Sequence, residues 1–342
     1  MAHEHFDIAK KQADLTAMMD RVLVNNRLGH AYIFEGMVGS GQEDMALYLA
    51  AYLNCLNPTD NGTPCGTCNH CCRILSTDYP DVFHIEPDGN TIKIDQTRDL
   101  KERLSMSSLE GDNQIFIIHE AEKMTVNAAN SLLKFIEEPH ENVFIFLLTN
   151  NRDAILSTIV SRCQMIHFPQ LNKLDLQALF EEAGIKPSMA TTLTALTNDV
   201  SEATTLAENE DFQQRLNWSL QWIDLIVKKD PRGLTMVASD WMKGPKGRAD
   251  MIQALNLVAF HFHDLLYLLL HVDQGQDNQD QLVFPNDFGK YQGMVNKITV
   301  AEATKALHLV GQAQRMIQSN VSVQSAMEYM VLAYWKKIGR NA

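Results

Sequence analysis

The chain has 342 residues, of which 45% are hydrophobic and 21% are charged, as in ordinary globular proteins. It is too long for one compact core, so we expect two or three domains. A formal net charge of −13 argues against a chain that coats nucleic acid by itself, because lysine and arginine supply most of the affinity for DNA. A local basic patch is still compatible with this charge.

No segment of the sequence indicates export or a membrane span. Residues 1–7 lack the basic and apolar regions of a secretory signal, so we expect a cytoplasmic protein. The most apolar later run, residues 255–272, is interrupted by His261, His263 and Asp264. These polar residues favour a buried helix over a span.

The chain begins with a predicted helix, strand, glycine-rich loop and helix. Apolar residues recur at helical spacing over Leu15–Leu23 and predict the first helix. Ala31–Phe34 is typical of a short buried strand that runs into the loop Gly36–Glu43, and Met45–Leu53 is typical of the helix behind it. A phosphate-binding loop requires this order of elements.

The loop keeps the glycine spacing of a phosphate-binding loop but not its charges. Gly36, Gly39 and Gly41 would let backbone N–H groups close around phosphates. Gln42 occupies the position of the lysine that reaches the terminal phosphates, and Glu43 occupies that of the hydroxyl that holds Mg²⁺. Taken alone, the glycines could equally form an ordinary tight turn.

Cysteine spacing predicts a metal site after this helix. Four thiolates can close a tetrahedral zinc site, and two-residue gaps let neighbouring cysteines bind one ion from a tight knuckle. The expected ligands are Cys55, Cys65, Cys68 and Cys71. Cys72 and His70 are possible substitutes, and a chance run of free thiols is the alternative. A closed site of four cysteines would be structural because it has no open coordination position.

Further strands follow in the first half of the chain. Val82–Ile85 and Ile92–Ile94 are predicted to be strands joined by a turn, and Ile115–Ile118 is a continuous apolar run of strand length. His119 and Glu120 follow this strand. A nucleotide hydrolase with a phosphate-binding loop places an aspartate for Mg²⁺ and a glutamate for the attacking water at these two positions. Glu120 is present, but the aspartate is replaced.

A helix and two strands complete the predicted α/β part. The helix covers Val126–Glu138 and is ended by Pro139. Val143–Leu148 and Met165–Phe168 are the strands. Before the second of them lies Arg162, bracketed by small residues, which in isolation is typical of a solvated surface charge.

The second half of the chain is predicted to be helical. Leu174–Ala183 and Ser188–Leu196 suggest short helices, and the polar stretch Gln274–Gln281 suggests a flexible loop. Long amphipathic helices are expected at Phe212–Val227, Ala249–Val272, Val300–Ile317 and Val323–Ile338. We expect three histidines of the second long helix to be core or interface residues and not metal ligands: His261, His263 and His271.

Several motifs, taken in order, resemble one protein family. They are His30–Gly36, the four-cysteine knuckle, Ala129–Pro139 and Ser161–Cys163. Together they are similar to the clamp-loader branch of the AAA+ family and, within it, to the delta-prime subunits of bacterial DNA polymerase III. The motifs cover about the first half of the chain, and the second half agrees only as a helical block of the expected length.

The resemblance implies an α/β fold with three domains. An AAA+ P-loop domain with a parallel sheet would span residues 1–167 and include a zinc module at about 55–72. A small helical lid would follow at residues 168–208, and an all-α collar for oligomerisation at residues 209–342.

The resemblance also implies a function. Arg162 would project into the ATP site of a neighbouring subunit as an arginine finger, whereas Gln42, Glu43 and His119 would leave the chain's own site unable to hydrolyse ATP. Residues 196–203 also lack the second arginine that an active relative often has there. Backbone N–H groups could still bind a nucleotide weakly. We therefore expect no ATPase or polymerase activity from the isolated chain.

The implied partners are the gamma/tau-type motor and delta subunits of the loader. The sliding clamp and primed DNA would be reached through the complex, and no membrane would be involved. Two alternative functions would share part of this pattern. An active clamp-loader ATPase would need a lysine at position 42, and a zinc-containing scaffold or adaptor outside replication would need neither Arg162 nor the helix at 129–139.

Overall fold

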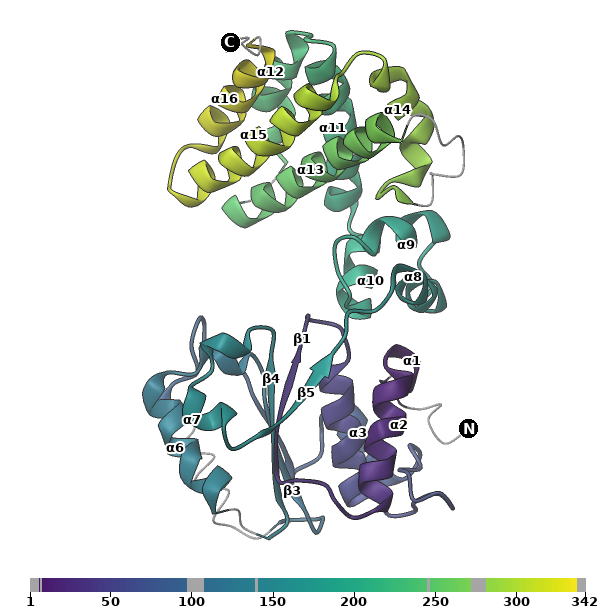
Figure 1. The fold of residues 1–342 in the computed structure, drawn as a ribbon, viewed down its shortest axis with the longest axis vertical. Coiled ribbons are helices and arrows are strands. Elements are labelled where there is room, and N and C mark those ends of the chain that lie inside the picture. Colours follow the sequence, from purple (N-terminus) through teal and green to yellow (C-terminus); the bar gives the residue numbers. More distant parts are fainter. Residues whose placement is uncertain are drawn as a thin grey trace. The chain divides into compact units, whose positions relative to one another are not determined.

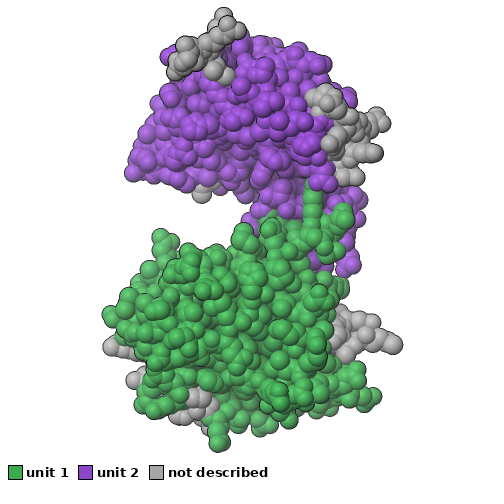
Figure 2. All heavy atoms as spheres, viewed as in Figure 1, with its two compact units in different colours: residues 1–176, 197–199 green, residues 177–196, 200–342 purple. Residues whose placement is uncertain are grey.

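The computed structural model describes residues 6, 8–96, 108–138, 141–244, 247–271 and 281–336. The chain forms two compact units (Figure 2). The first contains residues 1–176 and 197–199, and the second contains residues 177–196 and 200–342.

The first unit is built on a five-stranded parallel sheet (Figure 1). Its strands are β1 (Ala31–Gly36), β2 (Val82–Ile85), β3 (Gln114–Ile118), β4 (Val143–Thr149) and β5 (Gln164–Phe168). They lie in the order β2-β3-β4-β1-β5, and every neighbouring pair is parallel. The predicted α/β class with a parallel sheet is confirmed.

Helices cover both faces of this sheet. The helices are α1 (Ile8–Lys11), α2 (Ala13–Val24), α3 (Gln42–Asn54), α4 (Asn69–Leu75), α6 (Val126–Glu137) and α7 (Ser157–Val160), with 3₁₀ turns at Ala121–Lys123 and Arg152–Ala154. Because side chains alternate along a strand, Tyr32 and Phe34 pack in the α2 and α3 core, whereas Ala31 and Ile33 pack in the α6 core. Figure 1 shows α2 and α3 on one face and α6 and α7 on the other.

One predicted strand is wrong. In place of a strand at Ile92–Ile94, the structure has a single bridge between Ile92 and Met124, and residues 94–96 are helical. The Ile92 N–H donates to the Lys123 carbonyl at 2.9 Å, and the Ile92 carbonyl accepts from the Thr125 N–H at 3.0 Å. Ile92 is fully buried, so its apolar character reflects burial beside a turn and not strand pairing.

The second unit is helical. Its helices are α8 (Lys173–Glu182, which begins in the first unit), α9 (Pro187–Leu193), α10 (Val200–Glu208), α11 (Glu210–Val227), α12 (Arg232–Met236), a π-helical turn (Val237–Trp241), α13 (Arg248–Leu270), a 3₁₀ turn (Pro285–Asp287), α14 (Phe288–Val295), α15 (Val300–Gln318) and α16 (Val323–Trp335). Helix α13 packs between α11 and α15. Nearly all of the predicted loop at 274–281 lies outside the described residues.

Buried polar residues organise the core around α13. His261 is 1% exposed, and its ring lies 2.9 Å from the Ser219 hydroxyl and 2.5 Å from the Tyr291 hydroxyl. The buried Asp264 carboxylate accepts the backbone N–H groups of residues 283–284 at 2.9 Å each. The Asp264 bonds attach the segment before α14 to α13. The burial of His261 confirms that it is a core residue, whereas the side chain of His263 is 56% exposed and does not lie in the core.

Within the described residues, one stretch, Asp250–Leu270, is long and apolar enough to cross a membrane. However, 44% of its most apolar window is buried inside the protein. A core helix of a globular unit has the same length and composition, so this stretch is weak support for a span.

Stability of the second unit should depend on the charge of His261. Burial, with a smaller effect from Lys290, lowers the pKa of His261 to about 3, against about 6.5 in an unfolded chain. Between these values only the unfolded chain takes up this proton, so stability falls as the pH drops below about 6.5, by up to about 1.4 kcal/mol per pH unit. Urea unfolding of His261→Gln at pH 7 to 4.5 should therefore show a flatter pH dependence than wild type.

His308→Gln is the matched control, because His308 is exposed on α15 of the same unit. It should keep the wild-type pH dependence. Equal slopes for wild type and His261→Gln would contradict the assignment.

Candidate functional site

A cavity of 210 Å³ lies at one edge of the sheet in the first unit. The glycine-rich loop after β1, residues 119–120 after β3 and residues 149–150 after β4 line it. The carboxyl ends of parallel strands meet at one edge, which is where open α/β sheets bind ligands. The sheet therefore brings together the two degenerate motifs that the sequence places far apart.

The backbone of the loop has the shape that its glycines allow. Gly39 has φ +82° and Gly41 has φ +104°, in the left-handed region that favours glycine. A Cβ atom on Gly39 would lie 2.4 Å from the backbone carbon of Asn198. The loop thus packs directly against the backbone of Asn198 and Asp199, a contact for which the sequence holds no signal.

Polar contacts also hold the loop from within. The side-chain amide of Gln12 donates to the Ser40 carbonyl at 2.9 Å and to the Pro169 carbonyl at 2.7 Å. Gln42 is only 7% exposed, and its amide oxygen accepts from the Ser40 hydroxyl at 3.3 Å. The side chain in the lysine position is therefore buried in the loop.

The lining of the cavity is acidic. Its carboxylates belong to Glu43, Asp44, Glu120, Glu122 and Asp199. Lys11 is the one lysine or arginine among the described lining residues, and its ammonium lies 2.7 Å from the Asp44 carboxylate. Two of these acids also occupy the first turn of α3, where the helix dipole would otherwise attract a phosphate. The lining should repel a nucleoside triphosphate.

The side chains of Glu120 and His119, which follow β3, already contact other residues of the protein. Glu120 forms an ion pair with Lys123 and has φ +46°, a strained value for a residue with a side chain. A ring nitrogen of His119 lies 3.1 Å from a ring nitrogen of His84 on β2. Burial, and then His119, lower the pKa of His84. Sequence reasoning assigned no role to His84, because a histidine within a strand pattern gives no sign of what it faces.

Arg162 lies outside this cavity, just after α7. Its guanidinium lies 2.6 Å from the Glu137 carboxylate at the end of α6 and donates to the Thr158 carbonyl at 3.0 Å. The side chain is still 39% exposed. These contacts hold the guanidinium at the surface, where a second molecule can reach it.

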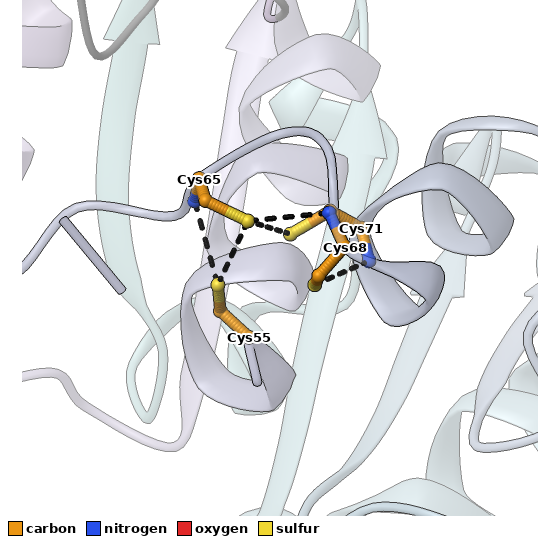
Figure 3. A group of neighbouring side chains, drawn as sticks. All are labelled: Cys55, Cys65, Cys68 and Cys71. Carbon is orange, nitrogen blue, oxygen red and sulfur yellow. Dashed lines mark hydrogen bonds between the residues drawn. The ribbon is translucent and has the colours of Figure 1, made fainter. Parts of the chain in front are cut away.

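Four cysteine sulfurs converge between α3 and α4 (Figure 3). All lie within 4.8 Å of one another, with Cys55 and Cys65 at 3.6 Å and Cys65 and Cys71 at 4.0 Å. Tetrahedral zinc with bonds of about 2.3 Å separates its sulfurs by about 3.8 Å. The group of Cys55, Cys65, Cys68 and Cys71 therefore forms a possible metal-binding site.

Backbone amides support this site. The N–H groups of Cys65, Cys68 and Cys71 donate to the preceding cysteine sulfur of the group at 3.3–3.4 Å. Although burial acts in the opposite direction, hydrogen bonds from the Thr67 and Cys68 backbone lower the pKa of Cys65 to about 6. A thiolate, the form that binds metal, is thereby favoured at Cys65, whereas burial raises the pKa of Cys55 and of Cys71.

The two possible substitutes point elsewhere. Cys72 is exposed, and its sulfur lies 3.5 Å from the Thr67 carbonyl. The Nδ1 atom of His70 lies 2.8 Å from the Asn54 carbonyl. Neither residue belongs to the converging group.

Known proteins resemble this chain over different lengths. The family described as "DNA polymerase III, delta subunit" matches residues 11–172. DNA polymerase III subunit delta' (delta-prime) of Bacillus subtilis is 32% identical over 327 residues, which cover 94% of this chain and 97% of the relative. The delta' subunit of Pseudomonas aeruginosa is 37% identical over 136 residues, or 39% of this chain and 41% of that one. DNA polymerase III subunit tau of Escherichia coli is 32% identical over 166 residues, or 48% of this chain but 25% of that one.

The charge of the cavity generates a direct prediction. The double variant Gln42→Lys with Glu43→Thr exchanges an acid for a hydroxyl and adds a cation, so it should bind ATP about tenfold or more tightly than wild type. Equilibrium binding of a fluorescent ATP analogue measures the difference. The control is His167→Lys, because His167 is exposed on β5 and lies outside the lining. A lysine at Gln114 on β3 would not serve, because Gln114 is buried and the substitution would perturb the fold. Equal affinities for the double variant and wild type would contradict the electrostatic explanation.

Proposed function

Since the chain belongs to the delta-prime family of bacterial DNA polymerase III subunits, we propose that it is the non-hydrolysing stator of a clamp loader. The acidic lining of its own phosphate-loop cavity is the observation that carries this proposal. A hydrolysing site needs a cation and a metal to neutralise the phosphates. Here the cation position is the buried Gln42, and Lys11 is paired with Asp44.

The chain would act on an ATP molecule bound by its neighbour. Arg162 would be the arginine finger, stabilising the charge that develops on the transferred phosphoryl group. Its exposure and its position outside the cavity suit action in trans, and the ion pair with Glu137 would orient the guanidinium before the neighbour arrives. Glu137 is therefore proposed as a positioning residue.

The partners would be a gamma/tau-type motor subunit and a delta subunit. Through them the chain would support ATP-driven loading of the sliding clamp onto primed DNA, with DNA synthesis performed by another subunit. We propose a division into an AAA+ domain at 1–167, a lid at 168–208 and a collar at 209–342. The collar would join the ring of subunits, and the complex would work in the cytoplasm.

We further propose that the four cysteines hold one structural zinc ion. Cys55 would link the end of α3 to the knuckle that begins α4, and with four protein ligands the ion would have no open position for a substrate. Its role would be to fold the segment between α3 and β2. This segment has few helices or strands of its own, so zinc binding would supply much of its stability.

The two other functions receive less support. An active ATPase of the motor type would need a cation at position 42, where the structure has a buried glutamine. A scaffold outside replication would not account for near end-to-end similarity to a delta' subunit.

The finger is tested in a loader reconstituted from this full chain with motor and delta subunits. Removing an arginine finger typically lowers the rate at the site it serves by about 10³- to 10⁵-fold. Arg162→Ala should therefore abolish the contribution of one ATP site to single-turnover hydrolysis stimulated by clamp and DNA, while the complex still assembles.

Arg73→Ala is a matched control, because Arg73 also pairs with a glutamate, Glu110, at 2.5 Å and is 30% exposed. It should leave hydrolysis unchanged. If Arg162→Ala behaves like Arg73→Ala, Arg162 is not the finger.

Zinc removal gives an independent test. Native protein should react rapidly with a thiol reagent at the exposed Cys72 alone, and a strong chelator should release zinc and expose four further thiols. Cys68→Ser should lose the tightly held zinc, whereas Cys72→Ser should keep it. Metal analysis after gel filtration measures the zinc content, and thiol titration is run in parallel. Reaction of all cysteines before chelation would refute the site.

A further inference from the structure

Three potential metal ligands converge at the edge of the cavity, apart from the cysteines. They are Glu43 in the first turn of α3, His84 on β2 and His119 after β3. One carboxylate oxygen and one nitrogen of each ring lie within 4.8 Å of one another. Because three separate elements supply these groups, their convergence is a property of the tertiary structure.

The two imidazoles already have the spacing of metal ligands. His84 Nδ1 and His119 Nε2 are 3.1 Å apart, and zinc with Zn–N bonds of about 2.0–2.1 Å in tetrahedral geometry separates two nitrogens by about 3.3–3.4 Å. The rings stack with 24° between their planes. A small outward movement of either ring would therefore admit an ion.

The surroundings favour a cation at this point. The nearby lining carries the carboxylates of Glu43, Glu120 and Glu122. A divalent cation would offset part of this negative charge.

The ligand types indicate which cation. Positions 43 and 119 are those at which a nucleotide hydrolase of this class uses a hydroxyl and an aspartate for Mg²⁺, an ion that prefers oxygen ligands. Here they are a glutamate and a histidine, and β2 adds a second histidine. Two imidazoles and one carboxylate suit Zn²⁺ or a similar transition metal.

We propose that Glu43, His84 and His119 form a second metal site, which binds Zn²⁺ or a similar divalent transition metal and is separate from the four cysteines. The ion would join the start of α3 to β2 and to the segment after β3. Three protein ligands would leave one coordination position to water. The site would bind metal without nucleotide, unlike a Mg²⁺ site that depends on bound phosphates.

The test uses the full chain with zinc already bound at the cysteines and Co²⁺ as the probe. Wild type should bind one further equivalent of Co²⁺, with visible absorption typical of nitrogen and oxygen ligands, and excess Mg²⁺ should not displace it. Glu43→Gln should weaken this binding by about tenfold or more. Glu43 is exposed, so this variant is not expected to unfold the protein.

His84→Gln should abolish the same signal, and His167→Gln is the matched control. His167 is 69% exposed and lies 3.6 Å from Glu35, a surface histidine–glutamate pair outside the group. It should bind Co²⁺ like wild type. If His84→Gln does not fold, Glu43→Gln decides the question. The proposal is wrong if no further Co²⁺ binds, if Glu43→Gln binds as tightly as wild type, or if Mg²⁺ competes equally.

Discussion

An acidic lining at one edge of a parallel sheet is the constraint on which the proposed function of this chain depends. The sheet order brings the segments after β1, β3 and β4 to one place, and carboxylates line that place. The backbone still forms the loop, because glycines at positive φ and the contact of Gly39 with Asn198 preserve its shape. The fold has thus kept the geometry of a phosphate site while its side chains oppose a phosphate.

Under the proposed function, this separation of geometry from charge would explain how the chain can serve an ATP-driven machine without hydrolysing ATP. The groups of its own site are engaged internally: Lys11 pairs with Asp44, and Glu120 pairs with Lys123. Arg162, by contrast, is held at the surface by Glu137. In the proposed function the chemically useful charge is the one presented outward, where it would complete a site that another subunit builds.

Buried polar groups and sulfurs stabilise the parts that the sheet does not organise. Converging thiols bring together the long connection between α3 and β2, which contains one short helix, α4. In the second unit, His261 attaches α14, and Asp264 the segment before it, to α13 through hydrogen bonds that are shielded from water. In both places a few directional contacts add to the apolar packing.

The sequence by itself determined the features that local patterns encode. Apolar runs predicted the five strands of the sheet, spacing predicted the cysteine group, and the replaced residues at 42, 43 and 119 predicted an altered phosphate site. The strand expected at Ile92–Ile94 was wrong, because an apolar pattern reports burial and not pairing. Only the tertiary structure decided which side chains meet: Gln12 with Pro169, His84 with His119, and Arg162 with Glu137. These partners are distant in sequence and are brought together by strand order and crossover connections, which no local periodicity records.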